Sequence, residues 1–334
     1  ERLSIALNGV DYVIHAAALK QVPTAEYNPF EYIKTNIIGA QNLIECCMER
    51  KIKKLVALST DKAAAPINLY GATKLCSDKL FVAANNLVGK GKTRFSIVRY
   101  GNVLGSRGSI IPYFRELLSK GIKQLPLTDE RMTRFIITIE DGIKFVFNSL
   151  NNMSGGEIFV PKIPSIKIKN LIYAMNNNKD YKIIGIRPGE KLHEQLISSA
   201  DSISTIDLEK YYAILPGDGV LLEEYKNQKK IINQVDKDFV YDSGSNESFL
   251  TIDELRNLNY KNAEIFIRHL HGACQAVRDC PVPVIAKVHG PCIGAGLELA
   301  VSCDLRCASY TSTFAMPEVQ VGIPSVIEAA LLPR

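Results

Sequence analysis

KKLVALSTDKAAAPINLYGATK, residues 53–74, decides the fold of this chain. Its apolar letters LVAL run together without alternating with polar ones, which predicts a strand buried on both faces. Pro66 disfavours helix at Ala65, so we expect a loop after the strand and a helix that starts near Asn68. A buried strand followed by a loop and a helix is the repeating step of a doubly wound parallel sheet.

The flanking segments repeat this step. DYVIHAA (11–17) and RFSIVRYGN (94–102) are further apolar runs that predict buried strands. FEYIKTNIIGAQNLIECCMERK (30–51) predicts a helix between the first two strands. The fold class is therefore α/β, with a doubly wound parallel sheet over about residues 1–120.

Beyond residue 120 the predicted elements become shorter. Residues 121–250 predict a smaller substrate lobe and a linker, and part of this region can return to the sheet. Within it, GIRPGEKLHEQL (185–196) predicts a turn that leads into a helix. Residues 226–248 are polar and predict a surface loop or linker. The composition changes again near residues 250–260, which indicates a domain boundary.

Composition narrows the class of protein. The 334 residues are 22% charged with a formal net charge of +5, which argues against a nucleic-acid or membrane-surface partner. No apolar run reaches about 18 residues, so we predict no membrane span and a cytoplasmic protein. The eight cysteines include no Cys-x-x-Cys pair, so we expect free thiols and no metal site.

Five residues of the opening stretch can take part in proton transfer. Thr60 ends the strand, and the carboxyl ends of strands line the ligand crevice in open α/β sheets. Asp61 and Lys62 follow in the loop above that crevice. Tyr70 and Lys74 are four residues apart and share one face of the helix. An ammonium beside the phenol would lower the tyrosine pKa and favour a general base for a substrate hydroxyl.

Six motifs, in order along the chain, resemble one family. They are DYVIHAAALKQVP, STDKAAAPINLYGATK, RYGNVLGSRGS, MTRF, GGEIFVPKIPS and IRPGEKLHE. They are similar to motifs of the extended short-chain dehydrogenase/reductases, specifically the inverting UDP-N-acetylglucosamine 4,6-dehydratases. The resemblance covers about residues 1–250. It implies a lyase of polysaccharide biosynthesis that acts on a UDP-sugar with NADP as cofactor and that tends to form homo-oligomers.

The resemblance also implies a role for each candidate catalytic residue. Tyr70, helped by Lys74 and with Thr60 beside the hydroxyl, would serve the oxidation of the sugar C4 hydroxyl by NADP. Lys62 would then remove the acidified C5 proton, Asp61 would protonate the departing C6 hydroxyl, and the hydride would return to C6. An ordinary dehydrogenase has no need of the Asp-Lys pair, which therefore indicates a dehydratase.

Further positions are carried over from the family one at a time. The cofactor contacts implied in this way are Ala16, Lys20, Ser59, Tyr70, Lys74 and Val103. The implied substrate contacts are Lys20, Asn102, Arg134, Arg187 and Glu190. Guanidinium groups suit the diphosphate of UDP, and a carboxylate suits its ribose hydroxyls.

The Gly-rich strand-turn-helix that binds a dinucleotide pyrophosphate is not found in the sequence. Comparison with the family implies that about 70 residues are absent from the front, comprising the first three strands and most of the NADP site. We therefore expect a partial Rossmann-like sheet in which the DYVIHAA strand lacks a partner on one flank.

The last segment, residues 259–334, resembles a second family. Its text CPVPVIAKVHGPCIGAGLELAVSCDLRCAS is similar to the crotonase superfamily of enoyl-CoA hydratases and isomerases. The resemblance implies an α/β segment, acyl-CoA as a partner, the Ala295 amide as an oxyanion donor, and Glu298 and Glu318 as catalytic glutamates. The segment that carries the second oxyanion donor is missing, so we expect a partial fold without hydratase activity.

Three functions follow from these observations. The first is the nucleotide-sugar dehydratase, with a cofactor half that we expect to be incomplete. The alternatives are an enoyl-CoA hydratase or isomerase located in the tail, and a catalytically inert chimera of the two segments.

Overall fold

A computed structural model describes residues 2–88, 93–106, 108–176, 180–217, 219–227 and 233–316, with side chains outside 259–270. The chain divides into two compact units, Glu1–Ile252 and Asp253–Arg334, which are described separately below.

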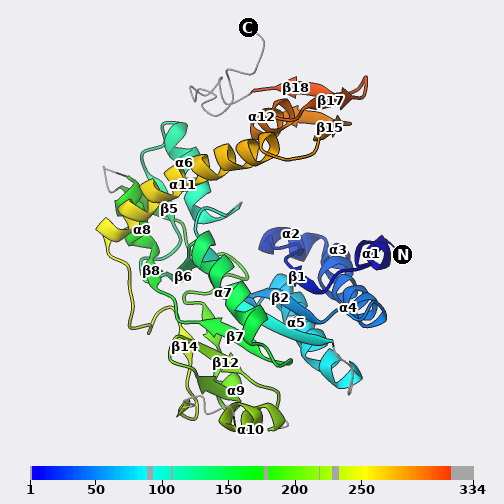
Figure 1. Ribbon diagram of the computed structural model, residues 1–334. Coiled ribbons are helices and arrows are strands. Elements are labelled where there is room, and N and C mark those ends of the chain that lie inside the picture. Colours follow the sequence, from blue (N-terminus) through cyan, green and yellow to red (C-terminus); the bar gives the residue numbers. More distant parts are fainter. Residues whose placement is uncertain are drawn as a thin grey trace. The chain divides into compact units, whose positions relative to one another are not determined.

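The first unit is built on a seven-stranded sheet in the order β1-β2-β3-β7-β12-β11-β13 (Figure 1). The first four strands are mutually parallel, and the last three join them in antiparallel pairing. The strand bounds are β1 Tyr12–His15, β2 Lys54–Thr60, β3 Arg94–Tyr100, β7 Ile158–Pro161, β12 Tyr211–Ile214, β11 Thr205–Asp207 and β13 Asn233–Gln234. The α/β prediction is confirmed, and four strands from beyond residue 150 return to the sheet.

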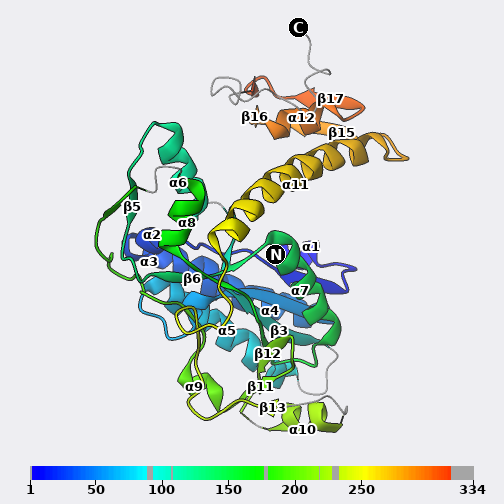
Figure 2. The ribbon, with the colours of Figure 1, turned by 90° about the vertical axis from the view of Figure 1, so that its left-hand side faces the viewer.

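Helices cover both faces of this sheet (Figures 1 and 2). Helices α4 (Gly39–Glu49) and α5 (Leu69–Val88) pack on one face, against side chains of β2 and β3 that include Leu55. Helices α7 (Ile139–Asn152) and α10 (Val220–Asn227) pack on the other, in the cluster that contains Val56. Adjacent residues of β2 therefore enter two different cores, which is why the strand reads as a continuous apolar run.

The predicted helix over residues 30–51 is divided into three segments. They are α3 Pro29–Tyr32, a π-helix at Ile33–Ile38 and α4; the short helices α1 Arg2–Ala6 and α2 Val22–Tyr27 precede them. The π-helical turn contains Asn36, whose buried amide accepts from Leu19 N and donates to Leu19 O, each at 2.9 Å. A π-turn frequently marks a functional site, and here it fixes the loop that follows β1.

Short strands and helices form the smaller lobe of the first unit. One three-stranded sheet has the order β4-β6-β8, and two strand pairs are β5-β9 and β10-β14. The bounds are β4 Asn102–Val103, α6 Ile110–Ser119, β5 Leu125–Leu127, β6 Thr133–Ile137, β8 Ser165–Lys167, α8 Ile168–Met175, β9 Tyr181–Ile183, β10 Gln195–Ile197, α9 Ser199–Ser202 and β14 Tyr241–Asp242.

Two local predictions in this lobe were wrong. The turn in residues 185–196 leads into strand β10 instead of a helix, because Leu196 and Ile197 are drawn into the sheet core. Residues 226–248 contain β13 and β14 instead of a plain linker. Tyr241 holds this segment, since its buried hydroxyl accepts from Ile163 N at 2.9 Å and lies 3.0 Å from Ile163 O.

Strand β1 lies at the edge of the sheet and, among the described strands, pairs with β2 alone. Its outward side chains Tyr12 and Ile14 are 54% and 42% exposed. Among the described residues the expected unpaired flank is therefore present, and the exposed side chains of Tyr12 and Ile14 lie on one face of the sheet beside it.

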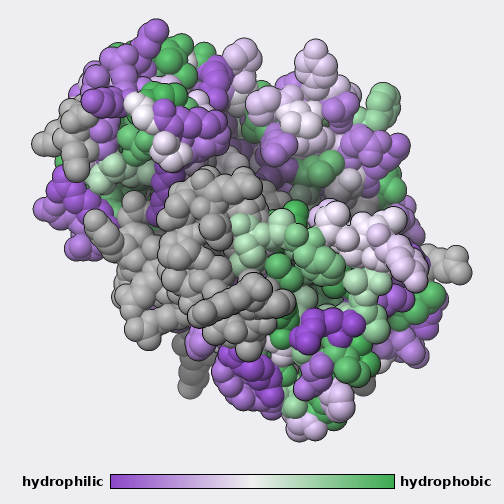
Figure 3. Space-filling model, turned by 90° about the horizontal axis from the view of Figure 1, so that it is seen from above, coloured by the Kyte–Doolittle hydropathy of each residue, from purple (hydrophilic) through white to green (hydrophobic). Residues whose placement is uncertain are grey.

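The second unit contains a long helix followed by two small strand pairs. Strand β15 pairs with β17 and β16 pairs with β18, both in parallel. The bounds are α11 Ile252–Arg278, β15 Ile285–Val288, β16 Pro291–Ile293, α12 Ala295–Val301, β17 Leu305–Ala308 and β18 Thr313–Ala315. Large apolar side chains such as Ile285, Leu305 and Phe314 are exposed here. Figure 3 shows hydrophobic surface in green on the face seen from above.

None of the helices among the described residues is long and apolar enough to span a membrane. Within the same residues there is also no cluster of three or more side chains suited to a metal ion.

Candidate active site

The candidate residues of the first unit meet at the carboxyl ends of the parallel strands. Ala16 and Lys20 follow β1, Asp61 and Lys62 follow β2, and Asn102 follows β3. Because β1, β2 and β3 run parallel, these loops share one edge of the sheet, where α/β folds bind ligands.

The loop after β2 is held in a tight 3₁₀ turn, Asp61–Ala63, against the start of α5. The Asn68 side chain accepts a hydrogen bond from Gly71 N at 2.8 Å, which caps the helix. A Cβ on Gly71 would collide with the carbonyl oxygen of Lys62, so only glycine allows this close approach. The helix and the Asp61–Lys62 pair are therefore fixed relative to each other.

We expect Gly71→Ala to lower the free energy of unfolding by about 1–3 kcal/mol, because the added methyl group overlaps backbone atoms. The displaced turn would also reduce any activity of Lys62. The matched control is Gly142→Ala in α7, where the closest atom to the new Cβ lies at 4.0 Å. Chemical denaturation of both variants checks this, and equal stabilities would contradict it.

Asp61 and Lys62 form an ion pair in which the carboxylate is buried and the lysine is partly exposed. Asp61 is 1% exposed, and its Oδ1 accepts from Thr60 Oγ1 at 2.9 Å and from Lys62 Nζ at 3.0 Å. Its Oδ2 is buried and has no hydrogen-bond partner among the described residues. A buried carboxylate oxygen without a partner is costly, so this atom is suited to a hydroxyl group of a bound molecule.

Lys62 also contacts a second carboxylate, since its Nζ lies 3.3 Å from Glu194 Oε1. Burial alone would lower the pKa of Lys62, but the charges of Asp61 and Glu194 outweigh burial and raise it. Lys62 is therefore held as an ammonium in this arrangement.

Tyr70 lies in the same region but not in the predicted electrostatic setting. Its phenol is 7% exposed, and burial raises its pKa to about 12 despite the opposing charge of Lys62 and a hydrogen bond with Thr60. The sequence-based prediction that Lys74 lowers this pKa is therefore wrong. Lys74 Nζ donates to Leu58 O at 2.8 Å, and burial lowers the pKa of Lys74 itself.

His15, at the end of β1, is also affected by burial and by the charge of Lys74. Burial and then the charge of Lys74 lower its pKa from 6.5 to about 4. Because the folded pKa lies below the unfolded value, stability is full above pH 6.5 and declines as pH falls through 4.

We therefore expect wild-type protein to lose about 1–3 kcal/mol of unfolding free energy from this group between pH 7 and pH 4. His15→Leu should remove that part of the decline. Denaturation of both proteins at several pH values measures it, and parallel curves would contradict the assignment.

A second charged group lies beside the first. Arg134 Nη2 is 3.5 Å from Glu190 Oε1, and Arg187 Nε is 3.3 Å from Glu190 Oε2. Arg134 Nε is also 3.8 Å from Glu194 Oε1. The carboxylate of Glu194 therefore connects Arg134 to Lys62.

The loop of residues 185–194 is fixed over the start of α5. Asn68 Nδ2 donates to Gly189 O at 2.9 Å, and Lys191 Nζ donates to Ala64 O at 2.8 Å. These contacts join residues more than 120 positions apart in the sequence. They bring the two predicted groups, catalytic and substrate-binding, to one place.

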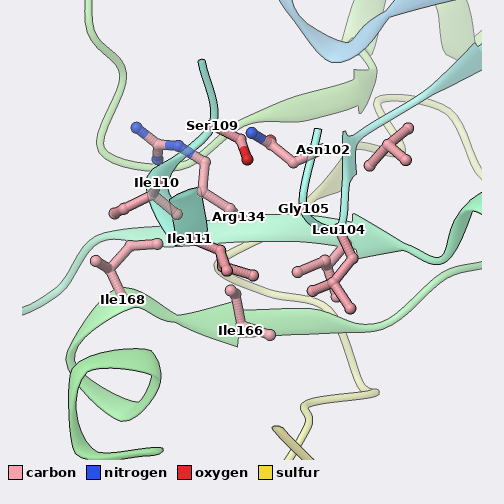
Figure 4. Close-up of a pocket in the computed structure, with 11 residues that line it drawn as sticks. Asn102, Leu104, Gly105, Ser109, Ile110, Ile111, Arg134, Ile166 and Ile168 are labelled. Atoms are coloured by element: carbon pink, nitrogen blue, oxygen red, sulfur yellow. The ribbon is translucent and has the colours of Figure 1, made fainter. Parts of the chain in front are cut away.

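A pocket adjoins this region (Figure 4). Asn102, Val103 and Arg134 are among its lining residues. Polar groups of Asn102, Ser109 and Arg134 lie on one side in Figure 4, and Leu104, Ile166 and Ile168 on the other. Asn102 Oδ1 and Ser109 Oγ are buried without a partner among the described residues, so they remain suited to a bound ligand.

Ser59 differs from the other predicted contacts. Its hydroxyl donates to buried Asp78 at 2.7 Å, and Arg99 is 3.3 Å from the same carboxylate oxygen. This side chain is therefore engaged in a buried network behind the strand end.

Sequence reasoning missed Asn36 and Glu194. Besides the loop after β1, Asn36 contacts Thr73 Oγ1 at 3.1 Å and so ties that loop to α5. No local pattern marks Asn36. Glu194 lies within the quoted IRPGEKLHE motif, and its spacing of four from Glu190 was the available signal.

In the second unit, Ala295 opens α12 and Glu298 is 4% exposed on that helix. Glu318 lies outside the described residues, so the predicted pair of glutamates is described at one position only.

Two family models match the chain. One, described as polysaccharide biosynthesis protein, matches residues 1–216, and one described as enoyl-CoA hydratase/isomerase matches residues 243–334. The chain belongs to the polysaccharide biosynthesis protein family. The tail is similar to part of the second family, as its motifs predicted.

Curated relatives support this membership. Two Campylobacter jejuni proteins, both named UDP-N-acetylglucosamine 4,6-dehydratase (inverting), are 56% identical over 262 residues and 64% identical over 216 residues. The matches cover 77% and 65% of this chain, and 78% and 65% of the relatives.

Solved structures are also similar to this chain. Pen from Bacillus thuringiensis is 35% identical with a TM-score of 0.70, covering 78% of this chain and 79% of that one. DesIV from Streptomyces venezuelae, a dTDP-glucose 4,6-dehydratase with NAD and TYD bound, is 23% identical. Its TM-score is 0.52, covering 57% of this chain and 66% of DesIV, which shows a shared fold.

Proposed function

We propose that this chain acts on UDP-N-acetylglucosamine as an inverting 4,6-dehydratase. The observation that carries the proposal is the Asp61–Lys62 ion pair at 3.0 Å beside the buried phenol of Tyr70. Among protein side chains, oxidation of a hydroxyl by a nicotinamide needs only a base such as the phenol, whereas elimination of water needs a further acid and base. The names and identities of the two Campylobacter relatives support the same reaction.

In this proposal Tyr70 takes the proton of the sugar C4 hydroxyl, with the Thr60 hydroxyl as its hydrogen-bond partner. A nicotinamide cofactor, when bound, supplies hydride acceptance at C4 and hydride return at C6. The raised pKa of Tyr70 means that the phenol is protonated at neutral pH, so its own proton must pass through the Thr60 hydroxyl to the Asp61 carboxylate as the substrate proton arrives.

Lys62 and Asp61 perform the elimination. The ketone at C4 acidifies the C5 proton, which Lys62 removes as a neutral amine. Once the proton from Tyr70 has passed from Asp61 to solvent through the partly exposed Lys62, the pair is again an ammonium and a carboxylate. Transfer of one proton from the Lys62 ammonium to the Asp61 carboxylate, 3.0 Å away, makes the amine neutral and the carboxyl an acid. The C6 hydroxyl then leaves as water after it receives that proton from Asp61. The unpartnered Oδ2 of Asp61 is the atom suited to contact that hydroxyl.

The UDP moiety is assigned to the adjacent charged group and pocket. We propose that Arg134 and Arg187, which both contact Glu190, bind the diphosphate, and that Glu190 binds the ribose hydroxyls. Asn102 and Lys20 complete the proposed substrate contacts. Each of these roles rests on position and on the family resemblance.

We propose NADP as the cofactor. Tyr70, Lys74, Ala16, Lys20, Ser59 and Val103 are its proposed contacts. The residues fit the nicotinamide end, since Lys74 Nζ makes one hydrogen bond, to Leu58 O, and keeps two N–H groups for a ribose.

Thermal unfolding with single ligands tests the proposal. UDP-N-acetylglucosamine should raise the melting temperature, and NADP should raise it more than NAD. Chromatography should then detect the dehydrated 4-keto sugar nucleotide after incubation with NADP. A shift with crotonyl-CoA alone would instead support the enoyl-CoA hydratase reading, and no shift with any ligand the inert chimera.

The tail carries no further proposed activity, since none of the observations on its described residues favours acyl-CoA binding. Cytoplasmic location and a homo-oligomer are part of the proposal through the family resemblance, and light scattering of the purified chain tests the oligomer.

A further inference from the structure

Glu194 occupies a central place between the two groups of charged residues. It is 3% exposed, and its Oε1 lies 3.3 Å from Lys62 Nζ and 3.8 Å from Arg134 Nε. Its backbone is fixed, because Glu194 N donates to Ser243 Oγ at 2.9 Å and Glu194 O accepts from Ser243 N at 2.8 Å. The carboxylate is therefore held where it contacts Lys62.

Lys62 has conflicting requirements, if the proposed function holds. As the base for the C5 proton it must be a neutral amine, but two carboxylates favour its ammonium form. The contact of Asp61 with Lys62 is explained by the reaction, because the elimination needs Asp61 as its acid. Glu194 has no such task in the reaction, so its contact with Lys62 calls for another explanation.

We propose that Glu194 is a positioning residue that fixes Lys62 between two carboxylates and sets the pH at which Lys62 becomes the base of the elimination. The charge of Glu194 favours the ammonium and keeps its Nζ beside Asp61. Glu194 Oε2 is buried and has no hydrogen-bond partner among the described residues. The contacts of this carboxylate with Lys62 and Arg134 are therefore made through Oε1.

Other charges around Lys62 act in both directions. Asp61 and Glu194 are the carboxylates that raise its pKa, while Arg134 lowers it. The charge of Lys62 lowers the pKa values of Lys20 and Lys191. By the same repulsion, their positive charges disfavour the ammonium form of Lys62. Tyr70 is neutral until about pH 12 and adds no charge below that. Removal of the Glu194 charge would leave Asp61 as the single carboxylate against three cations.

The direct test is the reactivity of Lys62 towards acetic anhydride as a function of pH, read by mass spectrometry of its tryptic peptide. Only the neutral amine reacts, so the midpoint of labelling reports the pKa of Lys62. In wild-type protein we expect a midpoint above the ordinary 10.5. In Glu194→Gln we expect the midpoint to fall by about one pH unit, or about tenfold faster labelling near pH 9.

Two variants separate charge from structure. Glu190→Gln also removes a carboxylate from Arg134 but does not contact Lys62, so its labelling midpoint should remain at the wild-type value. Glu194→Asp keeps the charge and should stay closer to wild type than Glu194→Gln. An unchanged midpoint in folded Glu194→Gln, or a wild-type midpoint below 10.5, would overturn the proposal. The wild-type measurement decides the matter if the variant does not fold.

A second readout is the pH profile of product formation. If Lys62 is the base, the rising limb of the profile should move to lower pH in Glu194→Gln by the same interval as the labelling midpoint. Labelling needs no substrate, so a moved midpoint in a chain without turnover would sustain the role of Glu194 while the proposed function fails. A moved midpoint with an unmoved profile would exclude Lys62 as the base that Glu194 controls.

Discussion

Tyr70→Phe is expected to lower formation of the 4-keto product by about 10²–10⁴-fold, because it removes the group that takes the C4 hydroxyl proton. The phenol is buried, and phenylalanine fills the same space, so the fold should be retained. Turnover of UDP-N-acetylglucosamine with NADP, and the melting temperature with the sugar nucleotide alone, measure the two effects. Retention of more than about a tenth of the wild-type rate would contradict the role of Tyr70.

Tyr241→Phe is the matched control. Burial raises the pKa of Tyr241 to about 12 as well, but its hydroxyl contacts the backbone of Ile163, which is not among the proposed catalytic or substrate contacts. This variant should lose about 1–3 kcal/mol of stability, since Ile163 N loses its acceptor, and keep its turnover in cool solution.

Lys62→Met is expected to have an effect of similar size at a later step. Methionine fills the space of the lysine stem but cannot accept the C5 proton, so product should fall by about 10²–10⁴-fold. Oxidation at C4 should persist, which gives reduced nicotinamide in a single turnover without dehydrated sugar. Wild-type protein in D₂O should place deuterium at C5, and the variant should not.

Lys54→Met is the control for this variant. Lys54 begins β2, and its ammonium donates to Leu150 O and Asn151 O at the opposite end of the strand from Lys62. Its loss removes a lysine from the far end of β2 without touching the turn that carries Lys62. If both lysine variants lost activity equally, the effect would be structural and Lys62 would not be the base.

The local parts of the fold were predictable from sequence. The apolar run 55–58 predicted the strand, and Pro66 predicted the loop after it. Both signals depend only on residues a few positions away. The Tyr70–Lys74 spacing placed both side chains on one face of α5. Residue patterns of this length carry their information locally, and the structure confirms the elements that they predicted.

The electrostatics and the distant contacts were not predictable in the same way. The pKa of Tyr70 depends on how deeply the phenol is buried, which the helical spacing of Lys74 does not contain. The role of Glu194 depends on a contact with Lys62 across 132 positions (194 − 62 = 132). Residues 185–196 were predicted to form a turn and a helix. The strand that follows the turn was missed because tertiary packing, which a local pattern does not contain, places Ile197 in the core.

The attachment of residues 185–194 to the start of α5 has a consequence for folding order. The ribosome synthesises Asp61 and Tyr70 long before Gly189 and Lys191, which hold the loop over them. Contacts so distant in sequence form slowly, because a long loop must close first. Newly made chains should therefore pass through a stage in which the parallel strands β1, β2, β3 and β7 are paired but the ion pair of Lys62 and Glu194 has not formed.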